Sequence, residues 1–202
     1  MLDPQFVFLA AALSIVGSAS YVRDTLRGST APHRVTWGLW AIEGILAFVV
    51  EVQQHVGVAS VMTLALGLIP FVVLLASFRN NLAVWKVDGV DIACGVVSLA
   101  GVVSWAMINQ PTVALVSFAA ADFIAAGPTF RKSWSSPDSE TPWIFVLGAV
   151  NTAITLLTLK NLTTAGALFP GVIMLTDSIL SVMILSRIGS RVALRRAGGL
   201  KR

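Results

Sequence analysis

The sequence predicts an all-α integral membrane protein with seven transmembrane helices, and three observations support this class. Hydrophobic residues make up 56% of the 202 residues and charged residues only 12%, whereas soluble domains carry roughly 25% charged residues. Seven apolar segments are separated by short polar breaks, and the basic residues concentrate in alternate breaks. A water-soluble fold of this size could not cover so much apolar surface. We therefore expect lipid to surround the helices.

Each expected helix is an apolar window of nearly the length needed to cross a bilayer, which is roughly 20 residues at about 1.5 Å rise per residue. The windows are 5–22, 35–52, 57–78, 90–108, 112–130, 143–159 and 165–186. The first window is expected to be a span rather than a cleavable signal peptide, because no basic segment precedes its apolar run. The single cysteine, Cys94, excludes an internal disulfide and a multi-cysteine metal site.

The basic residues predict the orientation of the helices. One side of the expected membrane receives 13 of the 14 Lys and Arg residues: Arg23, Arg27, Arg34, Arg79, Lys86, Arg131, Lys132, Arg187, Arg191, Arg195, Arg196, Lys201 and Arg202. Only Lys160 falls on the other side. The positive-inside rule makes the rich side cytoplasmic, so the N-terminus is expected outside and the C-terminus inside, which requires an odd number of spans.

This orientation places the protein in the bacterial inner (cell) membrane as a multi-pass protein. The isoelectric point is 9.8, and we expect the basic tail to contact anionic lipids. Nucleic acid is not needed as a partner to explain the basic charge.

The chain is expected to contain a repeat, because a shift of 108 residues lays the first three windows over the last three. The shift superimposes polar positions of the two halves: Arg23 on Arg131, Arg79 on Arg187, Ser14 on Asp122 and Glu43 on Asn151. This pattern is expected of parallel repeats related by an axis along the membrane normal. It predicts a first triple-helix bundle at 1–80, a linker helix at 81–110, a second bundle at 111–188 and a basic cytoplasmic tail at 189–202. In the linker helix, small residues at helical spacing indicate close packing; they are Cys94, Ser98 and Gly101.

One segment, "GPTFRKSW" at 127–134, resembles the Pro-Gln motif that ends the first helix of each repeat in PQ-loop and SWEET transporters. Pro128-Thr129 take the place of Pro-Gln, and basic residues and Trp134 follow. In the first half Ser20-Tyr21 stand there, followed by Arg23. The layout of three, one and three helices is similar to this superfamily over nearly the whole chain, and vitamin transporters of the PnuC type share the layout. The resemblance implies a pore between two bundles that alternates access, with a hinge at Pro128.

Three acids, Glu43, Asp122 and Asp177, fall near the middle of expected spans. A charge at the bilayer centre costs roughly 2.5–3.5 kcal/mol even on insertion scales, so we expect these side chains to face the bundle interior or a water-filled cavity. The alternative is a neutral acid that hydrogen-bonds a helix backbone and only fixes packing. Small or polar strips at helical spacing accompany the acids: Ser14, Gly17, Ser18 and Tyr21; Trp40, Glu43, Gly44 and Ala47; Ala126 and Thr129; Gly148, Asn151, Thr152 and Thr155; Pro170, Met174, Asp177, Ser178 and Ser181.

From these strips we predict a substrate site in the middle of the membrane. Its expected residues are Asp122, Glu43, Asn151 and Asp177, with Trp40 and Tyr21 as further contacts. Pro70, Pro128 and Pro170 are expected hinges, or else static kinks. The other tryptophans are expected to be interface anchors: Trp37, Trp85, Trp105, Trp134 and Trp143.

The expected function is that of a small secondary transporter or facilitator for a small polar solute. SWEET-type carriers of neutral sugars recognise ligands mainly with Asn and Trp, so three acids suggest a cationic or amine-bearing solute, or coupling to protons through Asp122 or Asp177. The alternative is a receptor-like or assembly protein that binds a partner helix or lipid without transport. A homo-oligomer is left open.

No enzyme activity, metal or other cofactor is expected. His33 and His55 fall on opposite sides of the membrane, so they cannot share a metal. The sequence has no Ser-His-Asp grouping, phosphate-binding glycine loop or HExxH motif. The last window also has no lysine of the kind that a retinal photoreceptor requires.

Overall fold

The computed structural model describes residues 3, 5–53, 55, 60–80, 87–108, 110–159 and 164–199. Over this part the chain is all-α, as predicted, and it forms no strand. The helices are α1 (Phe6–Arg27), α2 (Arg34–Gln53), α3 (Ser60–Arg79), α4 (Gly89–Ile108), α5 (Pro111–Ala125), α6 (Gly127–Ser135), the 3-10 helix η2 (Pro137–Ser139), α7 (Trp143–Thr158), α8 (Thr164–Ser186) and α9 (Ile188–Gly199).

Several helices have the composition of membrane spans. Among the described residues, three are long and apolar enough to cross a bilayer: α2, α3 and, within α8, Ala167–Ser186. Shorter apolar stretches occur in α4 and α7. Large apolar side chains are exposed on the outward faces of the helices, among them Phe8, Ile15, Val61, Val96, Leu157 and Val182. An apolar exterior of this extent is compatible with a membrane protein.

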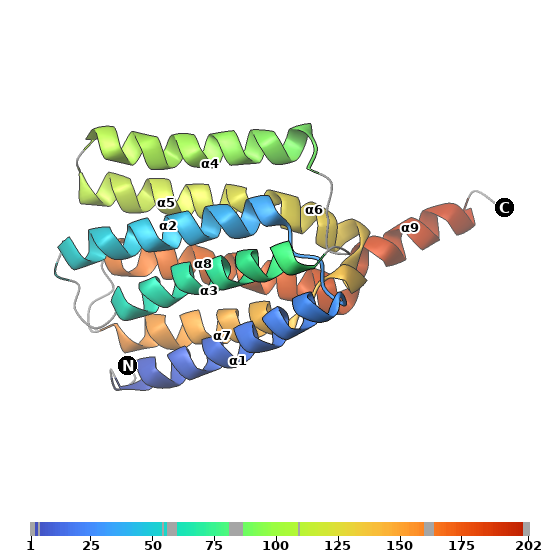
Figure 1. Cartoon of the computed structure of the whole chain (residues 1–202), viewed down its shortest axis with the longest axis horizontal. Coiled ribbons are helices and arrows are strands. Elements are labelled where there is room, and N and C mark those ends of the chain that lie inside the picture. Colours follow the sequence, from blue (N-terminus) through green and yellow to red (C-terminus); the bar gives the residue numbers. More distant parts are fainter. Residues whose placement is uncertain are drawn as a thin grey trace.

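The long helices lie side by side along the longest axis of the molecule (Figure 1). Helix α3 contacts both α1 and α2, and α8 contacts both α5 and α7. Across the middle of the molecule, α1 packs against α7 and α2 packs against α5. Helix α4 covers α5 and part of α2 at one edge (Figure 1). The contact of α1 with α3 therefore corresponds to that of α5 with α8, and the contact of α2 with α3 corresponds to that of α7 with α8.

Helix α5 and helix α6 form one bent rod rather than a helix followed by a polar break. Ala126 joins them with helical dihedral angles, φ −69° and ψ −19°. Pro128 lies in the first turn of α6, where its missing N–H removes a backbone hydrogen bond. The helix nevertheless continues, since the Phe130 N–H donates to the Ala126 carbonyl at 2.8 Å. The polar break predicted from Arg131 onward is therefore wrong as far as Ser135.

Close helix contacts depend on glycine at two facing positions. A Cβ atom on Gly44 of α2 would lie 2.6 Å from the Gly67 Cα of α3. The two backbones touch, because neither residue has a side chain to hold them apart. In the predicted small-residue strip of α4, Ser98 packs against α5, since its hydroxyl donates to the Ala121 carbonyl at 3.0 Å.

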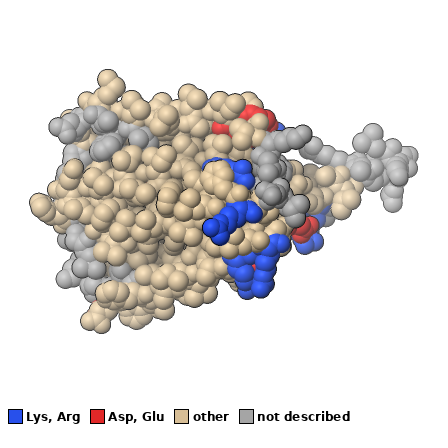
Figure 2. Space-filling model, in the orientation of Figure 1, with Lys and Arg blue, Asp and Glu red and all other residues tan. Residues whose placement is uncertain are grey.

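The described basic residues gather at the end of the molecule from which α9 projects (Figure 2). Residues 189–199 of the predicted tail belong to this helix. Five residues named in the sequence analysis lie outside the described part: Trp85, Lys86, Lys160, Lys201 and Arg202. The side chains of Trp105, Arg195 and Arg196 also lie outside it.

Candidate functional site

A cavity lies between helices of both halves of the chain. It contains about 660 Å³ of space that no atom fills, its mouth included. Helices α1, α2, α3, α5, α7 and α8 all contribute to its wall. The space open to the centre of a water-sized sphere is about 80 Å³, well below the roughly 300–1,000 Å³ of typical small-molecule sites. Only a small solute therefore fits unless the walls of the cavity move.

The cavity brings together four of the six side chains predicted as substrate contacts. Asp122, Asn151, Asp177 and Trp40 line it, and the predicted hinge Pro70 lines it as well. The structure does not bring the remaining two, Glu43 and Tyr21, to the cavity wall.

Asp122 lies in the last turns of α5 with its side chain against α2. The Trp40 indole N–H donates to the Asp122 backbone carbonyl at 3.1 Å, which holds the Trp40 ring against α5. Asp122 is close enough to both Glu43 and Asp177 for the three carboxyl groups to interact electrostatically. The acids therefore form a row from α2 through α5 to α8.

Glu43, at the α2 end of this row, is fully buried. Its side chain is 0% exposed, and neither carboxyl oxygen has a hydrogen-bond partner among the described residues. The alternative of an acid that hydrogen-bonds a helix backbone is therefore not what this geometry shows. Burial of a carboxylate without a partner costs free energy, so Glu43 needs either a proton or a further group that offsets this cost.

Asn151 forms a polar contact at the α7 wall of the cavity. Its amide group donates to the Ser14 hydroxyl of α1, and the Thr155 hydroxyl donates to the Asn151 carbonyl at 3.0 Å. The pair Ser14–Asn151 and the pair Asp122–Glu43 are related by the 108-residue shift. The aromatic pair Trp37–Phe145 is also related by it, and these two rings meet with centroids 6.4 Å apart.

Asp177 lies directly against the backbone of α7. A Cβ atom added to Gly148 would overlap the Asp177 carboxyl, with Cγ at 3.1 Å. Glycine at 148 thus creates the space that the carboxyl group occupies. Next to Asp177, Thr176 also lines the cavity, and its hydroxyl is buried without a partner among the described residues.

Aromatic side chains close one end of the cavity. The Trp37 and Trp40 rings meet edge to face at 5.2 Å, and Tyr21 lies 4.8 Å from Trp37 on the far side. The prediction of an interface anchor is wrong for Trp37, because its side chain is only 2% exposed. Trp134 and Trp143 are 46% and 55% exposed, and their anchoring role stays a prediction.

A buried polar network lies beyond the aromatic side chains. The Tyr21 hydroxyl donates to Glu140 at 2.5 Å, and the Lys132 ammonium donates to the other oxygen of Glu140 at 2.7 Å. Lys132 also donates to the Ala31 carbonyl and to the Ser139 carbonyl. Its side chain is 0% exposed, which the assignment of Lys132 to the basic residues of the cytoplasmic side did not predict. Tyr21 is therefore a partner of Glu140 rather than a cavity contact.

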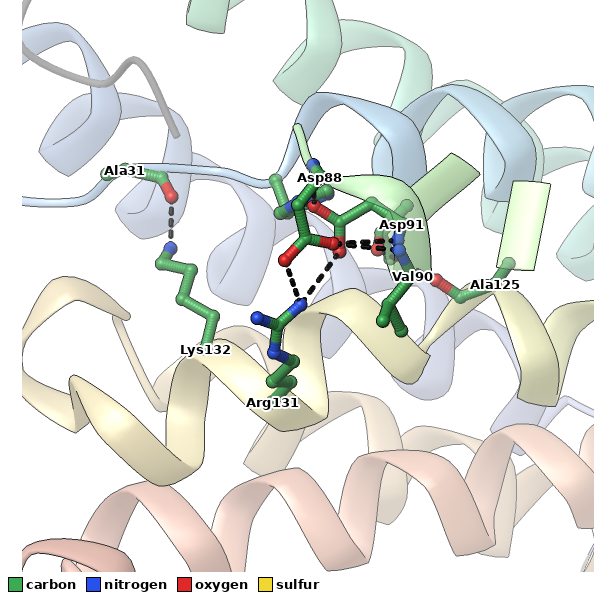
Figure 3. A network of polar contacts seen from close by, with 9 residues as sticks. Ala31, Asp88, Val90, Asp91, Ala125, Arg131 and Lys132 are labelled. Atoms are coloured by element: carbon green, nitrogen blue, oxygen red, sulfur yellow. Dashed lines mark hydrogen bonds and ion pairs between the residues drawn. The ribbon is translucent and has the colours of Figure 1, made fainter. Parts of the chain in front are cut away.

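A second ionic cluster joins α6 to the start of α4. Arg131 pairs with Asp88, and Figure 3 shows both side chains turned toward each other. The Arg131 hydrogen bond lowers the pKa of Asp88, and the same contact raises the pKa of Arg131. Asp91 accepts a hydrogen bond from Nε2 of the buried His33 at 3.2 Å.

The described residues contain no group of three or more His, Cys, Asp or Glu side chains disposed to hold a metal ion. Comparison with protein-family models, curated proteins and solved structures gave no match for this chain. Function must therefore be inferred from the cavity and its surroundings.

Proposed function

We propose that the protein is a small secondary transporter or facilitator that moves a small polar solute across a membrane by alternating access. The observation that carries this proposal is the cavity in which Asp122, Asn151 and Asp177 converge from three helices. Polar groups that converge inside an apolar helical bundle are typical of substrate and ion pathways. The solute is either cationic or moved together with protons.

The proposed architecture has seven spans, formed by α1, α2, α3, α4, α5, α7 and α8. They would make two parallel triple-helix bundles joined by α4. The matching helix contacts of the two halves support this arrangement, as do the shift-related pairs Ser14–Asn151 and Asp122–Glu43. Such a layout resembles PQ-loop and SWEET-like transporters. The gathering of described basic residues at one end supports an outside N-terminus and a cytoplasmic C-terminus in a bacterial inner membrane.

Alternating access requires that the two ends of the cavity open in turn. The basic end is closed by buried Tyr21, Trp37 and Phe145 and by the Lys132–Glu140 ion pair behind them. We propose that the helices move at their prolines to open this end. Pro70 lines the cavity, Pro128 lies at the bend between α5 and α6, and Pro170 lies within α8.

The alternative function, binding of a partner helix or lipid without transport, requires the acids to face outward. Glu43 is instead fully buried, and Asp122 and Asp177 line one cavity. These positions favour transport over the alternative.

A thermal-shift screen of the detergent-purified protein tests the proposal. Sugars, amino acids, polyamines and vitamin precursors are added at two pH values, because a ligand that binds the folded protein stabilises it by mass action. We expect a stabilising solute whose effect is lost in Asp122→Asn. The matched control is Glu51→Gln, which changes a buried acid of α2 that does not line the cavity.

Uptake of the stabilising solute into proteoliposomes then separates transport from binding. If the solute binds but does not cross the bilayer, the receptor-like alternative is correct. If no solute of any class stabilises the protein and Asp122→Asn is as stable as the wild type, the cavity is not a substrate site.

A further inference from the structure

The cavity wall holds two acidic side chains and no basic side chain. Asp122 and Asp177 both line it, and no Lys, Arg or His is among its lining residues. Among the described residues no hydrogen-bond donor reaches either carboxyl group. The buried cation Lys132 is paired with Glu140 beyond the aromatic side chains. Two adjacent carboxylates repel each other in a poorly solvated site, so a bound cation stabilises their ionised form, whereas an anion does not.

A second observation also points to a ligand. The Thr176 side chain is 2% exposed and lines the cavity, and its hydroxyl has no hydrogen-bond partner among the described residues. Thr176 directly precedes Asp177 on α8, at the acidic side of the cavity. An unpartnered buried hydroxyl is costly, and a solute with its own donor or acceptor would satisfy it.

The remaining wall is aromatic and apolar. Trp40, Phe145 and Phe169 line the cavity with their rings, and Trp40 is held in place by its hydrogen bond to the Asp122 carbonyl. Aromatic faces attract cations, most strongly the weakly hydrated ammonium groups of organic solutes. A proton alone would neutralise the acids but would need neither the cavity volume nor these rings.

Gly148 determines where the Asp177 carboxyl group lies. Because a side chain at 148 would overlap the Asp177 carboxyl, only glycine allows this group to rest on the α7 backbone. Glycine at 148 therefore allows the Asp177 carboxyl group to lie at the α7 wall of the cavity, on the same helix as Asn151.

We propose that the cavity binds a small organic monocation, a protonated amine or a quaternary ammonium ion. Its cationic group lies between Asp122 and Asp177 and its apolar part packs against Trp40 and Phe145. Gly148 is the positioning residue that keeps Asp177 available to the cation. This inference rests on the proposed transport function and names the class of solute for the same site.

The test compares cations with neutral molecules of the same shape. Choline is paired with 3,3-dimethylbutan-1-ol, and 2-phenylethylammonium with 2-phenylethanol. Binding to the purified wild-type protein is measured by isothermal titration calorimetry, and charge movement is measured as a current across a supported membrane of proteoliposomes. We expect at least one cation to bind at least about tenfold more tightly than its neutral partner, since one charge interaction of about 1.4 kcal/mol gives that ratio. The same cation is expected to produce an inward positive current.

Variants of cavity residues test whether the cation binds in the cavity. Asp177→Asn and Gly148→Ala are each expected to weaken binding of that cation by about tenfold or more while leaving the neutral partner unaffected. The controls are Glu51→Gln, which removes an acid outside the cavity wall, and Gly171→Ala, whose added Cβ meets no atom within 4 Å. Thermal unfolding of each variant shows whether it is folded. If Gly148→Ala does not fold, Asp177→Asn alone decides the placement.

The outcomes separate this inference from the proposed function. Equal binding of cations and neutral partners, or a neutral solute that is transported without current, overturns the monocation assignment but leaves transport intact. A current that depends only on a proton gradient and on no added cation also overturns it, and favours proton coupling. Cation binding that persists unchanged in Asp177→Asn places the cation elsewhere and overturns the assignment.

Discussion

Two buried acids of this protein, Glu140 and Glu43, differ in whether they have a partner among the described residues. Lys132 and Glu140 are both fully buried and form an ion pair that Tyr21 extends. Glu43 is equally buried but has no partner among the described residues. Removal of one partner from a buried ion pair typically destabilises a protein by about 3–5 kcal/mol, so loss of either Lys132 or Glu140 is expected to destabilise the closed form of the basic end. Glu43 contributes no such stabilisation, which is consistent with a functional rather than a structural role.

His33 leads to a prediction for the dependence of stability on pH. It precedes α2 and is buried against Asp91, with Lys132 and Glu140 as the other charged groups near it. Burial lowers the pKa of His33 from its ordinary value of 6.5, despite the opposing effect of Asp91. The unfolded chain therefore binds a proton more readily than the folded protein. Stability from this residue is complete above the ordinary pKa and is lost as the pH falls below it.

His33→Gln tests this sign, because the glutamine amide can donate to Asp91 but does not titrate. We expect the wild-type melting temperature to fall more steeply between about pH 7.5 and 5.5 than that of the variant. Thermal unfolding in detergent at five pH values measures both slopes. Equal slopes would show that His33 does not contribute to the pH dependence.

At the scale of helices, the close contact of α2 and α3 gives a prediction about packing. Gly44→Ala would place a Cβ atom 2.6 Å from the Gly67 Cα, with no flexible side chain to yield. Overpacking of this kind costs about 1–3 kcal/mol. The variant is therefore expected to unfold at a lower temperature than the wild type.

Gly38→Ala is the matched control on the same helix. Its added Cβ would make an ordinary contact of 3.8 Å with Leu74, and alanine is the better helix former by about 1 kcal/mol. We expect no loss of stability in this variant. If Gly44→Ala were as stable as Gly38→Ala, the backbones of α2 and α3 would not be in contact.

Helix positions were predictable from the sequence because a spanning helix needs a long uninterrupted apolar window. The window 143–159 matches α7 (Trp143–Thr158) almost residue for residue. Helix α6 could not be predicted in this way, since its charges resemble those of a loop between spans. An apolar window also does not show which side chains of the helix face lipid and which face the protein interior. For this reason Trp37, near the start of its window, was predicted to be an interface anchor although it is buried.

At the scale of the whole molecule, part of the candidate site was predictable and part was not. Asp122, Asn151 and Asp177 could be predicted because a polar group in an apolar window costs so much free energy that it usually has a functional role. The space that Gly148 provides for Asp177 depends on how α7 packs against α8, and sequence spacing does not contain that information. The 108-residue shift does predict which residues are equivalent, and the pairs Ser14–Asn151 and Asp122–Glu43 agree with it.

The orientation of the whole chain gives the final prediction. If the two halves are parallel repeats, an odd number of spans separates the two ends, and the basic residues hold the C-terminal end in the cytoplasm. Asp3 and Arg191 are exposed near opposite ends of the chain. In a Cys94→Ser background, Asp3→Cys is expected to react with a membrane-impermeant maleimide in spheroplasts, whereas Arg191→Cys reacts only after the membrane is opened. Cys94→Ser alone, which has no thiol, gives the background. Reaction of both cysteines from one side would exclude an odd number of spans and with it the parallel repeat, whereas a reversed pattern would keep the repeat and invert the direction of the proposed transport pathway.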